Sequence, residues 1–327
     1  PHRGKRIYAN DDNNGVSTRE VANINAYLVG GENVIVEKRS TSISGLNPMD
    51  LGNMPYDGGN LLLTADELQD LQLDAAQRSR FIRRIYGSQE FIYNQERYCL
   101  WIENSDLAEA LTIPEVERRV SAVRSMRLKS SDAGGRAMAT RAHQLREMKR
   151  SNRQTLIMPR TSSETRHYLP AGLLSAETTV SSEAFALFDA PTWALALLAS
   201  RTHLVWVATV CGQLETRYRY SNVLGWNTFP VPILTEKNKA DLTKCAEEIL
   251  LAREAHFPKT IADLYDPDQM PDDLRAAHDR NDEVLERIYI GRRFRNDTER
   301  LEKLFDLYTK MTATSQTPAG RSKKVRA

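Results

Sequence analysis

The sequence contains few cysteines, little net charge and no long apolar run, and each absence excludes a class of protein. Cys99, Cys211 and Cys245 are the three cysteines in 327 residues, and they lie far apart without a CxxC pair. This pattern argues against a disulfide framework and a structural zinc site, and it is typical of the reducing cytosol. The longest apolar region, residues 190–212, is interrupted at residues 201–203 and lacks the ~20 uninterrupted apolar residues that span a membrane. We therefore expect a cytoplasmic globular protein.

Sequence signatures of common enzymes are absent as well. The chain has no HExxH, no GxSxG, no phosphate-binding P-loop and no Rossmann glycine pattern. Its six histidines are scattered without the spacing of metal ligands, and the acidic cluster at residues 263–273 is more typical of a solvated loop than of a cation site. We predict that this chain has no catalytic residue of its own and binds no metal or cofactor.

Basic residues are concentrated in one segment, residues 118–160, which we call the basic segment. It holds 12 lysines and arginines against Asp132 and Glu147, so its net charge is +10 and that of the rest of the chain is −8, given the overall +2. Such a concentrated positive field suits phosphate contact and steered association with DNA. The residues expected to contact phosphate are Arg124, Arg127, Lys129, Arg141, Arg146, Lys149 and Arg150. The alternative is a pair of solvated basic helices without a partner.

The segment 212–221, GQLETRYRYS, contains residue types that pair with base edges. If it is one strand, Glu215, Arg217 and Arg219 lie on one face, because side chains alternate along a strand. These three side chains would span about 13 Å, close to four base pairs. Arginine can donate two hydrogen bonds to guanine, and glutamate can accept one from the cytosine amino group. The alternative is a helix or hairpin in which Glu215 and Arg219 form only a surface ion pair.

The remaining pattern predicts an α+β fold, with a mixed, β-rich part that contains inserted helices and is followed by an all-α part. We expect short β-like runs at 33–39, 90–94, 97–102, 155–163 and 178–187. Helices are expected from the Thr64–Glu67 capping box to about residue 76, from Pro114 to Lys129, at 137–150 and in two buried pieces within 190–212.

The C-terminal part is expected to be helical. Helices are predicted at 240–256, from Pro271 to a stop at Gly291, and from a cap at Asp297 onward. The last helix carries an apolar stripe, which is more typical of intradomain core than of a partner surface. The stripe consists of Leu301, Leu304, Phe305, Tyr308 and Met311.

Seven segments, in this order, resemble the C-terminal portion of the MmeI-like (type IIL) restriction-modification enzymes. They are ANINAYL at 22–28, YDGGN at 56–60, RYCLW at 97–101, PRTSS at 159–163, VCGQL at 210–214 with YRYS at 218–221, NTFP at 227–230 and ADLYD at 262–266. No single segment is specific, but their common order is. The resemblance covers about residues 22–312.

This resemblance implies a module that recognises a specific double-stranded DNA sequence for an adenine-N6 DNA methyltransferase. In that family, specificity varies around the positions matched by Glu215, Arg217 and Arg219 and at the polar ends of the two preceding strands. The corresponding residues here are Arg160, Thr161, Ser162, Ser163, Ser181, Ser182 and Glu183. The methyltransferase domain of the same polypeptide, with S-adenosylmethionine, is expected upstream, since Asn47–Asp50 lacks the second proline and the aromatic residue of the family's catalytic motif.

The resemblance also implies a division of the chain. We expect residues 1–22 to end an upstream methyltransferase domain or linker, residues 23–233 to form the target recognition domain, residues 234–313 to form a helical C-terminal domain, and residues 314–327 to be a disordered tail. Two other functions are open on the sequence. One is a structural or protein-interaction module that docks to a partner subunit through its helical tail, and the other is a self-sufficient enzyme with an unfamiliar site.

Overall fold

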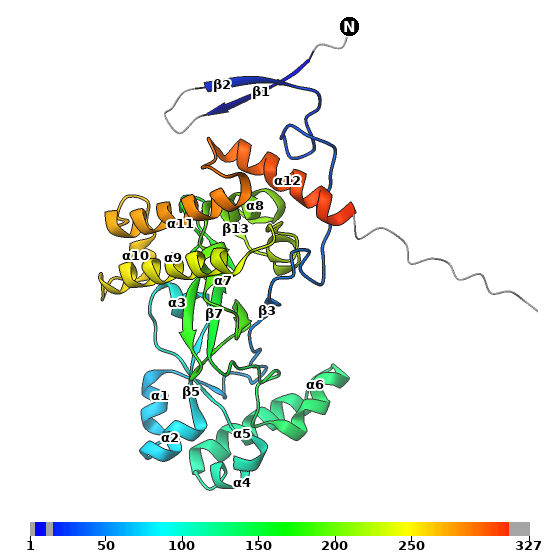
Figure 1. Cartoon of the computed structure of the whole chain (residues 1–327). Coiled ribbons are helices and arrows are strands. Elements are labelled where there is room, and N and C mark those ends of the chain that lie inside the picture. Colours follow the sequence, from blue (N-terminus) through cyan, green and yellow to red (C-terminus); the bar gives the residue numbers. More distant parts are fainter. Residues whose placement is uncertain (1–3, 11–15, 314–327) are drawn as a thin grey trace, which may run out of the picture.

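A computed structural model describes residues 4–10 and 16–313 of the chain (Figure 1). The strands are β1 (Lys5–Asn10), β2 (Val16–Val21), β3 (Asp50–Leu51), β4 (Leu62–Leu63), β5 (Ile82–Tyr86), β6 (Tyr98–Leu100), β7 (Gln154–Pro159), β8 (Thr161–Ser162), β9 (Gly172–Ser175), β10 (Thr178–Val180), β11 (Ala184–Phe188), β12 (Gln213–Leu214) and β13 (Arg217–Arg219). They form four small sheets, ordered β1-β2, β10-β5-β6-β4, β3-β11-β7-β9 and β12-β13-β8.

Helices cover these sheets and make up the C-terminal part, so the fold is α+β as predicted. The helices are α1 (Ala65–Asp70), α2 (Ala75–Phe81), α3 (Ser88–Ile92), α4 (Leu107–Ala110), α5 (Pro114–Leu128), α6 (Ala133–Ala137), α7 (Trp193–Leu198), α8 (Arg201–Val210), α9 (Glu236–Glu254), α10 (Ile261–Leu264), α11 (Asp272–Ile290) and α12 (Asp297–Ala313). In the described ranges, no helix is both long enough and apolar enough to cross a bilayer.

The apolar residues form two main cores. One belongs to a lobe that we call the α5 lobe, residues 61–145, in which Leu61, Trp101, Val116 and Leu145 are buried together. The other is larger and joins the β3-β11-β7-β9 sheet with α7, α8 and the C-terminal helices. Figure 1 shows α1, α2, α4, α5 and α6 at one end of the molecule and α7 to α12 toward the other. The α5 lobe therefore has a core of its own.

The C-terminal helices share the larger core with the sheet that precedes them. Leu304, Phe305 and Tyr308 of α12 are buried, and the ring of Phe305 lies 5.3 Å from Trp206 of α8. These three side chains of the stripe are therefore core and not free to dock to a partner subunit, as expected. The core that they join is not confined to residues 234–313, because it includes residues of the preceding part of the chain.

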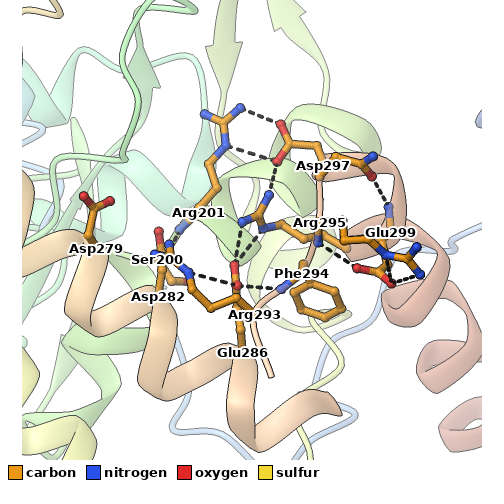
Figure 2. Close-up of polar contacts among 12 residues, drawn as sticks. Ser200, Arg201, Asp279, Asp282, Glu286, Arg293, Phe294, Arg295, Asp297 and Glu299 are labelled. Carbon is orange, nitrogen blue, oxygen red and sulfur yellow. Dashed lines mark hydrogen bonds and ion pairs between the residues drawn. The ribbon is translucent and has the colours of Figure 1, made fainter. Parts of the chain in front are cut away.

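Charged side chains lock α8, α11 and α12 together at one point (Figure 2). Arg201 at the start of α8 donates to both carboxylate oxygens of Asp297, at 3.2 and 2.5 Å. Arg300 of α12 donates through Nε, at 2.8 Å, to Glu286 of α11, which is fully buried. Burial raises the pKa of the neighbouring Asp282 to about 7. The beginnings of α8 and α12 are thus held to the middle of α11.

Local signals placed several helix ends correctly. Thr64 and Glu67 form the predicted capping box of α1, and Gly291 ends α11 in the left-handed conformation, with φ 78°. The predicted cap of α12 was wrong by one residue, because Asn296 rather than Asp297 accepts the Glu299 N–H, at 2.9 Å. Asp297 is instead held by Arg201 and Arg300.

Other predicted elements were wrong. Residues 90–94 lie in helix α3 and its end rather than in a strand, and residues 33–39 form no strand. The second basic helix predicted at 137–150 does not form, because after α6 and a short 3₁₀ turn at Met138–Arg141 the chain is irregular up to β7. The expected disordered tail, residues 314–327, lies outside the described residues.

Candidate nucleic-acid interface

The segment expected to read bases is a hairpin, not a single strand. β12 and β13 pair with Gln213 opposite Tyr218 and Leu214 opposite Arg217, which leaves Glu215 and Thr216 as a two-residue turn. Glu215 has φ 58°, as the first position of a tight hairpin turn of this kind requires. The prediction that Glu215 shares a strand face with Arg217 and Arg219 was therefore wrong. Glu215 stays close, since its carboxylate accepts a hydrogen bond from Arg217 Nη2 at 2.8 Å.

Arg217 and Arg219 do share one face of β13. Both are exposed, while Tyr218 between them is half-buried and packs against the larger core. Within the described ranges, the guanidinium of Arg219 has no hydrogen-bond or ion-pair partner, and that of Arg217 is bonded to Glu215 through one nitrogen only. Most donors on this face are therefore available to a ligand.

β13 also pairs with β8, which brings a second set of expected residues to the hairpin. Tyr218 lies opposite Ser162 and Arg219 opposite Thr161, and Tyr220 N–H donates to the carbonyl of Arg160 at 2.9 Å. We call the sheet β8-β13-β12 the reading ribbon. Since β8 follows β7 directly, the ribbon continues from the β3-β11-β7-β9 sheet.

One expected residue of the ribbon is not available to a base. The side chain of Ser162 is buried, with 5% of the residue exposed, and its hydroxyl lies 3.5 Å from Arg166 Nη1. The base-reading role predicted for Ser162 is therefore contradicted by its burial, whereas Thr161 and Ser163 on either side are half-buried.

The loop at residues 181–183 lies against the start of β8. Arg160 donates through Nη1 to the Ser182 carbonyl at 3.3 Å, and its N–H donates to Ser88 Oγ at 3.2 Å. Ser88 Oγ in turn donates to the Glu183 carbonyl at 2.6 Å. Arg160 thus meets Ser182 and Glu183, which are distant from it in the sequence, at one edge, with Ser182 half-buried and Glu183 exposed. Ser181 is buried and its hydroxyl accepts the Glu183 N–H at 3.3 Å.

Sequence reasoning missed the pair of residues that anchors the ribbon. Tyr220 follows β13, is 5% exposed, and its hydroxyl lies 2.9 Å from Nε2 of His203, which is fully buried in α8. Burial lowers the pKa of His203 to about 3, so its imidazole is neutral, and burial raises the pKa of Tyr220. The alternation of Tyr218 and Tyr220 on the packing face was the available signal.

The loop after β8 closes over the turn of the hairpin. A hydrogen bond from the Thr216 side chain lowers the pKa of the Glu164 carboxyl. Both the turn and this loop are on the surface, so the tip of the ribbon carries the two carboxylates of Glu164 and Glu215 beside the two arginines of β13. The ribbon is therefore a surface of mixed charge with hydrogen-bond donors and acceptors side by side.

The basic segment is much less available than its composition suggests. Arg127 is fully buried and donates hydrogen bonds to the carbonyls of five residues. These are Pro55, Tyr56, Met138, Arg141 and Gln144, at 2.8–3.3 Å. Its predicted phosphate contact is wrong, because its donors are used to hold the irregular chain after α6 against α5.

Most of the other side chains expected to contact phosphate already form hydrogen bonds or ion pairs within the protein. Arg141 is half-buried and donates to the Arg146 carbonyl at 2.7 Å. Lys149 Nζ lies 3.4 Å from Asp50, and Arg146 Nε lies 3.2 Å from Glu147. Arg150 lies 3.8 Å from Glu103. Only Arg124 and Lys129 of this set are exposed and have side chains without a partner among the described residues.

The two exposed cations without a partner, Arg124 of α5 and Lys129 directly after it, lie far from the reading ribbon. Figure 1 places α5 at one end of the molecule and β13 beside α8 toward the other. A duplex that touched both would have to run along the molecule. Within residues 4–10 and 16–313, no group of three or more His, Cys, Asp or Glu side chains is arranged to hold a metal ion.

Comparisons with known proteins show which family the chain is similar to. Residues 30–233 match the family described as "MmeI, target recognition domain", and residues 234–315 match "MmeI, C-terminal domain". DNA methyltransferase A of Bacillus subtilis (strain 168) is 38% identical over 292 residues, which are 89% of this chain and 33% of that protein. The chain thus spans about a third of the length of this curated relative.

A solved structure is similar over almost the whole chain. It is that of the type IIL restriction-modification enzyme MmeI in complex with DNA, with a TM-score of 0.82 and 35% sequence identity. The similarity covers 95% of this chain and 42% of that one.

Proposed function

The chain belongs to the MmeI family, and on that premise we propose that it recognises a specific sequence of double-stranded DNA. The observation that carries this proposal is the reading ribbon, where Arg217 and Arg219 stand exposed on one face of β13. Arginine is suited to the guanine edge in the major groove, and Glu215 beside Arg217 is suited to the cytosine amino group. Arg160, Ser182 and Glu183 form a second group of reading candidates at the adjoining edge.

Phosphate contacts are assigned to fewer residues than the sequence predicted. We propose Arg124 and Lys129 as the strongest candidates, because no carboxylate or carbonyl of the described chain competes for them. Arg146, Lys149 and Arg150 are exposed or half-exposed and can exchange their ion pairs for phosphate at a cost. Phosphate contacts orient a protein on the duplex, whereas base contacts select the sequence.

The chain would serve a longer polypeptide. We propose that a methyltransferase domain of the same polypeptide, upstream of this chain, transfers a methyl group from S-adenosylmethionine to the N6 atom of an adenine. This chain would place that adenine, flipped out of the stack, in the methyltransferase pocket. Residues 1–22 would join the two parts, residues 23–233 would recognise the target and residues 234–313 would support the recognition domain. The protein would act in the cytoplasm.

Mapping methylated adenines tests this function and identifies the target in the same experiment. The genome of the source organism is sequenced for N6-methyladenine with the gene intact and with the gene deleted. We expect one short sequence motif to lose its methylation on deletion and to regain it when the intact gene is restored. A restored gene carrying Arg217→Ala should leave the motif under-methylated. An unchanged methylation map after deletion would contradict the proposal.

A further inference from the structure

A second acidic–basic pair lies beside the 181–183 loop and was not predicted from the sequence. Arg97 precedes β6 and lines a small pocket with Gly87, Ser181, Ser182 and Glu183. Its Nη1 atom lies 3.7 Å from Glu183 Oε2, and the Glu183 side chain is 60% exposed. We propose that Arg97 and Glu183 together read one G·C base pair of the DNA target. This inference rests on the proposed function and adds a specificity-determining residue to it.

Arg97 is held from the protein side by a buried carboxylate. Its Nη1 atom donates to Glu90 Oε1 at 3.1 Å, and the Glu90 side chain is only 6% exposed. The other oxygen of Glu90 accepts the Gly87 N–H at 2.8 Å. Because Glu90 is fixed by the backbone, the guanidinium of Arg97 is fixed as well, and little side-chain entropy remains to be lost on binding.

The donors that a base would need are still free. A guanidinium has five N–H groups, and in Arg97 the contacts with Glu90 and Glu183 both use Nη1. The Nε and Nη2 atoms have no acceptor among the described residues, and neither is among the buried polar atoms that lack a partner. This Nε–Nη2 edge is one of the two edges through which arginine can donate two parallel hydrogen bonds.

A carboxylate beside a guanidinium matches a G·C pair. In the major groove, cytosine presents its N4 amino donor next to the O6 and N7 acceptors of guanine. Glu183 can accept from cytosine while Arg97 donates to guanine. An A·T pair also presents two acceptors and one donor, but its donor lies between the acceptors, so it offers no two adjacent acceptors to the guanidinium edge. Glu215 and Arg217 form a similar pair on the ribbon, with 2.8 Å between Oε2 and Nη2.

Because Gly87 has no side chain, the carboxylates of Glu90 and Glu183 can both lie against its backbone. A Cβ atom at this position would lie 2.6 Å from Glu90 Oε2 and 2.7 Å from Glu183 Oε2, which is too close for either. The pair is also tied to the reading ribbon, because Ser88, the next residue, bonds to the Arg160 N–H and to the Glu183 carbonyl. Arg97, Glu183 and the ribbon thus belong to one hydrogen-bonded edge.

Selection from a random duplex pool tests this inference. Wild-type protein and variants are each incubated with duplexes randomised over eight base pairs, and the bound duplexes are sequenced. Arg97→Lys keeps the positive charge beside Glu90, so the protein should fold, but an ammonium lacks the two-donor edge. We expect Arg97→Lys and Glu183→Gln to lose discrimination at the same G·C position, by about 5- to 150-fold, the range of a good bidentate contact.

Arg78→Gln is the matched control, because Arg78 is an exposed arginine of α2 with no carboxylate partner in the described chain. It should leave every position of the motif unchanged. The inference is overturned if Arg97→Lys keeps full discrimination, or if it and Glu183→Gln relax different positions, while the wild type still enriches a motif. A wild type that enriches no motif would contradict the proposed function itself, and with it this inference.

Discussion

The reading ribbon and the basic segment both carry arginines, but these arginines differ in exposure and in how many of their hydrogen-bond donors are already used. On the ribbon, Arg217 and Arg219 are exposed, and Arg219 has no partner within the described ranges. In the basic segment, Arg127 is fully buried with five carbonyl partners, and Arg141 also bonds to backbone carbonyls. The difference teaches that a count of cations along the sequence overestimates the charge that a segment can offer to DNA, because arginine is also a common way to satisfy backbone carbonyls of irregular chain.

The largest expected effect is on stability and comes from the basic segment. Arg127→Ala should lower the free energy of unfolding by about 3–5 kcal/mol, the range seen when a buried charged group is removed from its partners. Arg124→Ala, on the exposed face of the same helix, should change it by less than about 0.5 kcal/mol. Urea unfolding of both variants measures this. Equal and small losses would mean that Arg127 is not the structural arginine described above.

The next effect is on sequence selectivity and comes from the ribbon. Arg217→Ala should weaken binding to the target duplex by about 1–3 kcal/mol and relax the preference at one base pair, while unfolding stays close to wild type. Binding to the target and to single-substituted duplexes, measured by fluorescence anisotropy, gives both quantities. Losses of the same size on target and scrambled duplexes would show that Arg217 contacts phosphate instead.

A smaller effect concerns the anchor of the ribbon. The pKa of His203 in the folded protein is about 3, below its ordinary value of about 6.5, so the unfolded chain binds the proton more tightly. The stability that this neutral histidine contributes is present above pH 6.5 and is lost as the pH falls toward 3. Between pH 7 and 5.5, the unfolding free energy of the wild type should fall by about 1 kcal/mol relative to His203→Gln.

The comparison with the variant isolates His203 from other buried groups. Asp282, whose pKa is raised to about 7, gives the opposite pH dependence, but both proteins carry it and it cancels in the difference. Urea unfolding of both proteins at the two pH values is the measurement. A difference that does not change with pH would contradict a buried neutral His203.

The smallest expected effect is on the salt dependence of DNA binding, and it distinguishes cations without a partner from those in an ion pair. Arg124→Ala should weaken binding to all duplexes alike and lower the slope of log K against log salt by about one. The sequence predicted a phosphate contact for Lys149 as well, but the ion pair with Asp50 at 3.4 Å already uses that charge, so the effect of Lys149→Ala on the slope should be smaller. A larger change for Lys149→Ala would reverse this ranking.

Short-range sequence signals predicted more of the fold than of the site. The Thr64 capping box, the Pro114 helix start and the Gly291 stop are short-range chemistry and could be predicted. The hairpin at 213–219 was only one of the alternatives, because its turn places Glu215 at positive φ without the usual glycine or asparagine. The role of Arg97 was missed because it depends on contacts with Glu90 and Glu183. These two residues are distant from each other in sequence, and the fold brings their carboxylates together beside Gly87.

The central claim is that the ribbon selects the DNA sequence while the cations at the C-terminal end of α5, Arg124 and Lys129, only hold the duplex. The direct test is the ratio of affinities for the target, as mapped by methylation, and a scrambled duplex, measured for two double variants. Arg217→Ala with Arg219→Ala should lower this ratio at least about 10-fold, and Arg124→Ala with Lys129→Ala should leave it unchanged while lowering both affinities. An unchanged ratio for the ribbon variant, with the ratio lost in the α5 variant, would contradict the account.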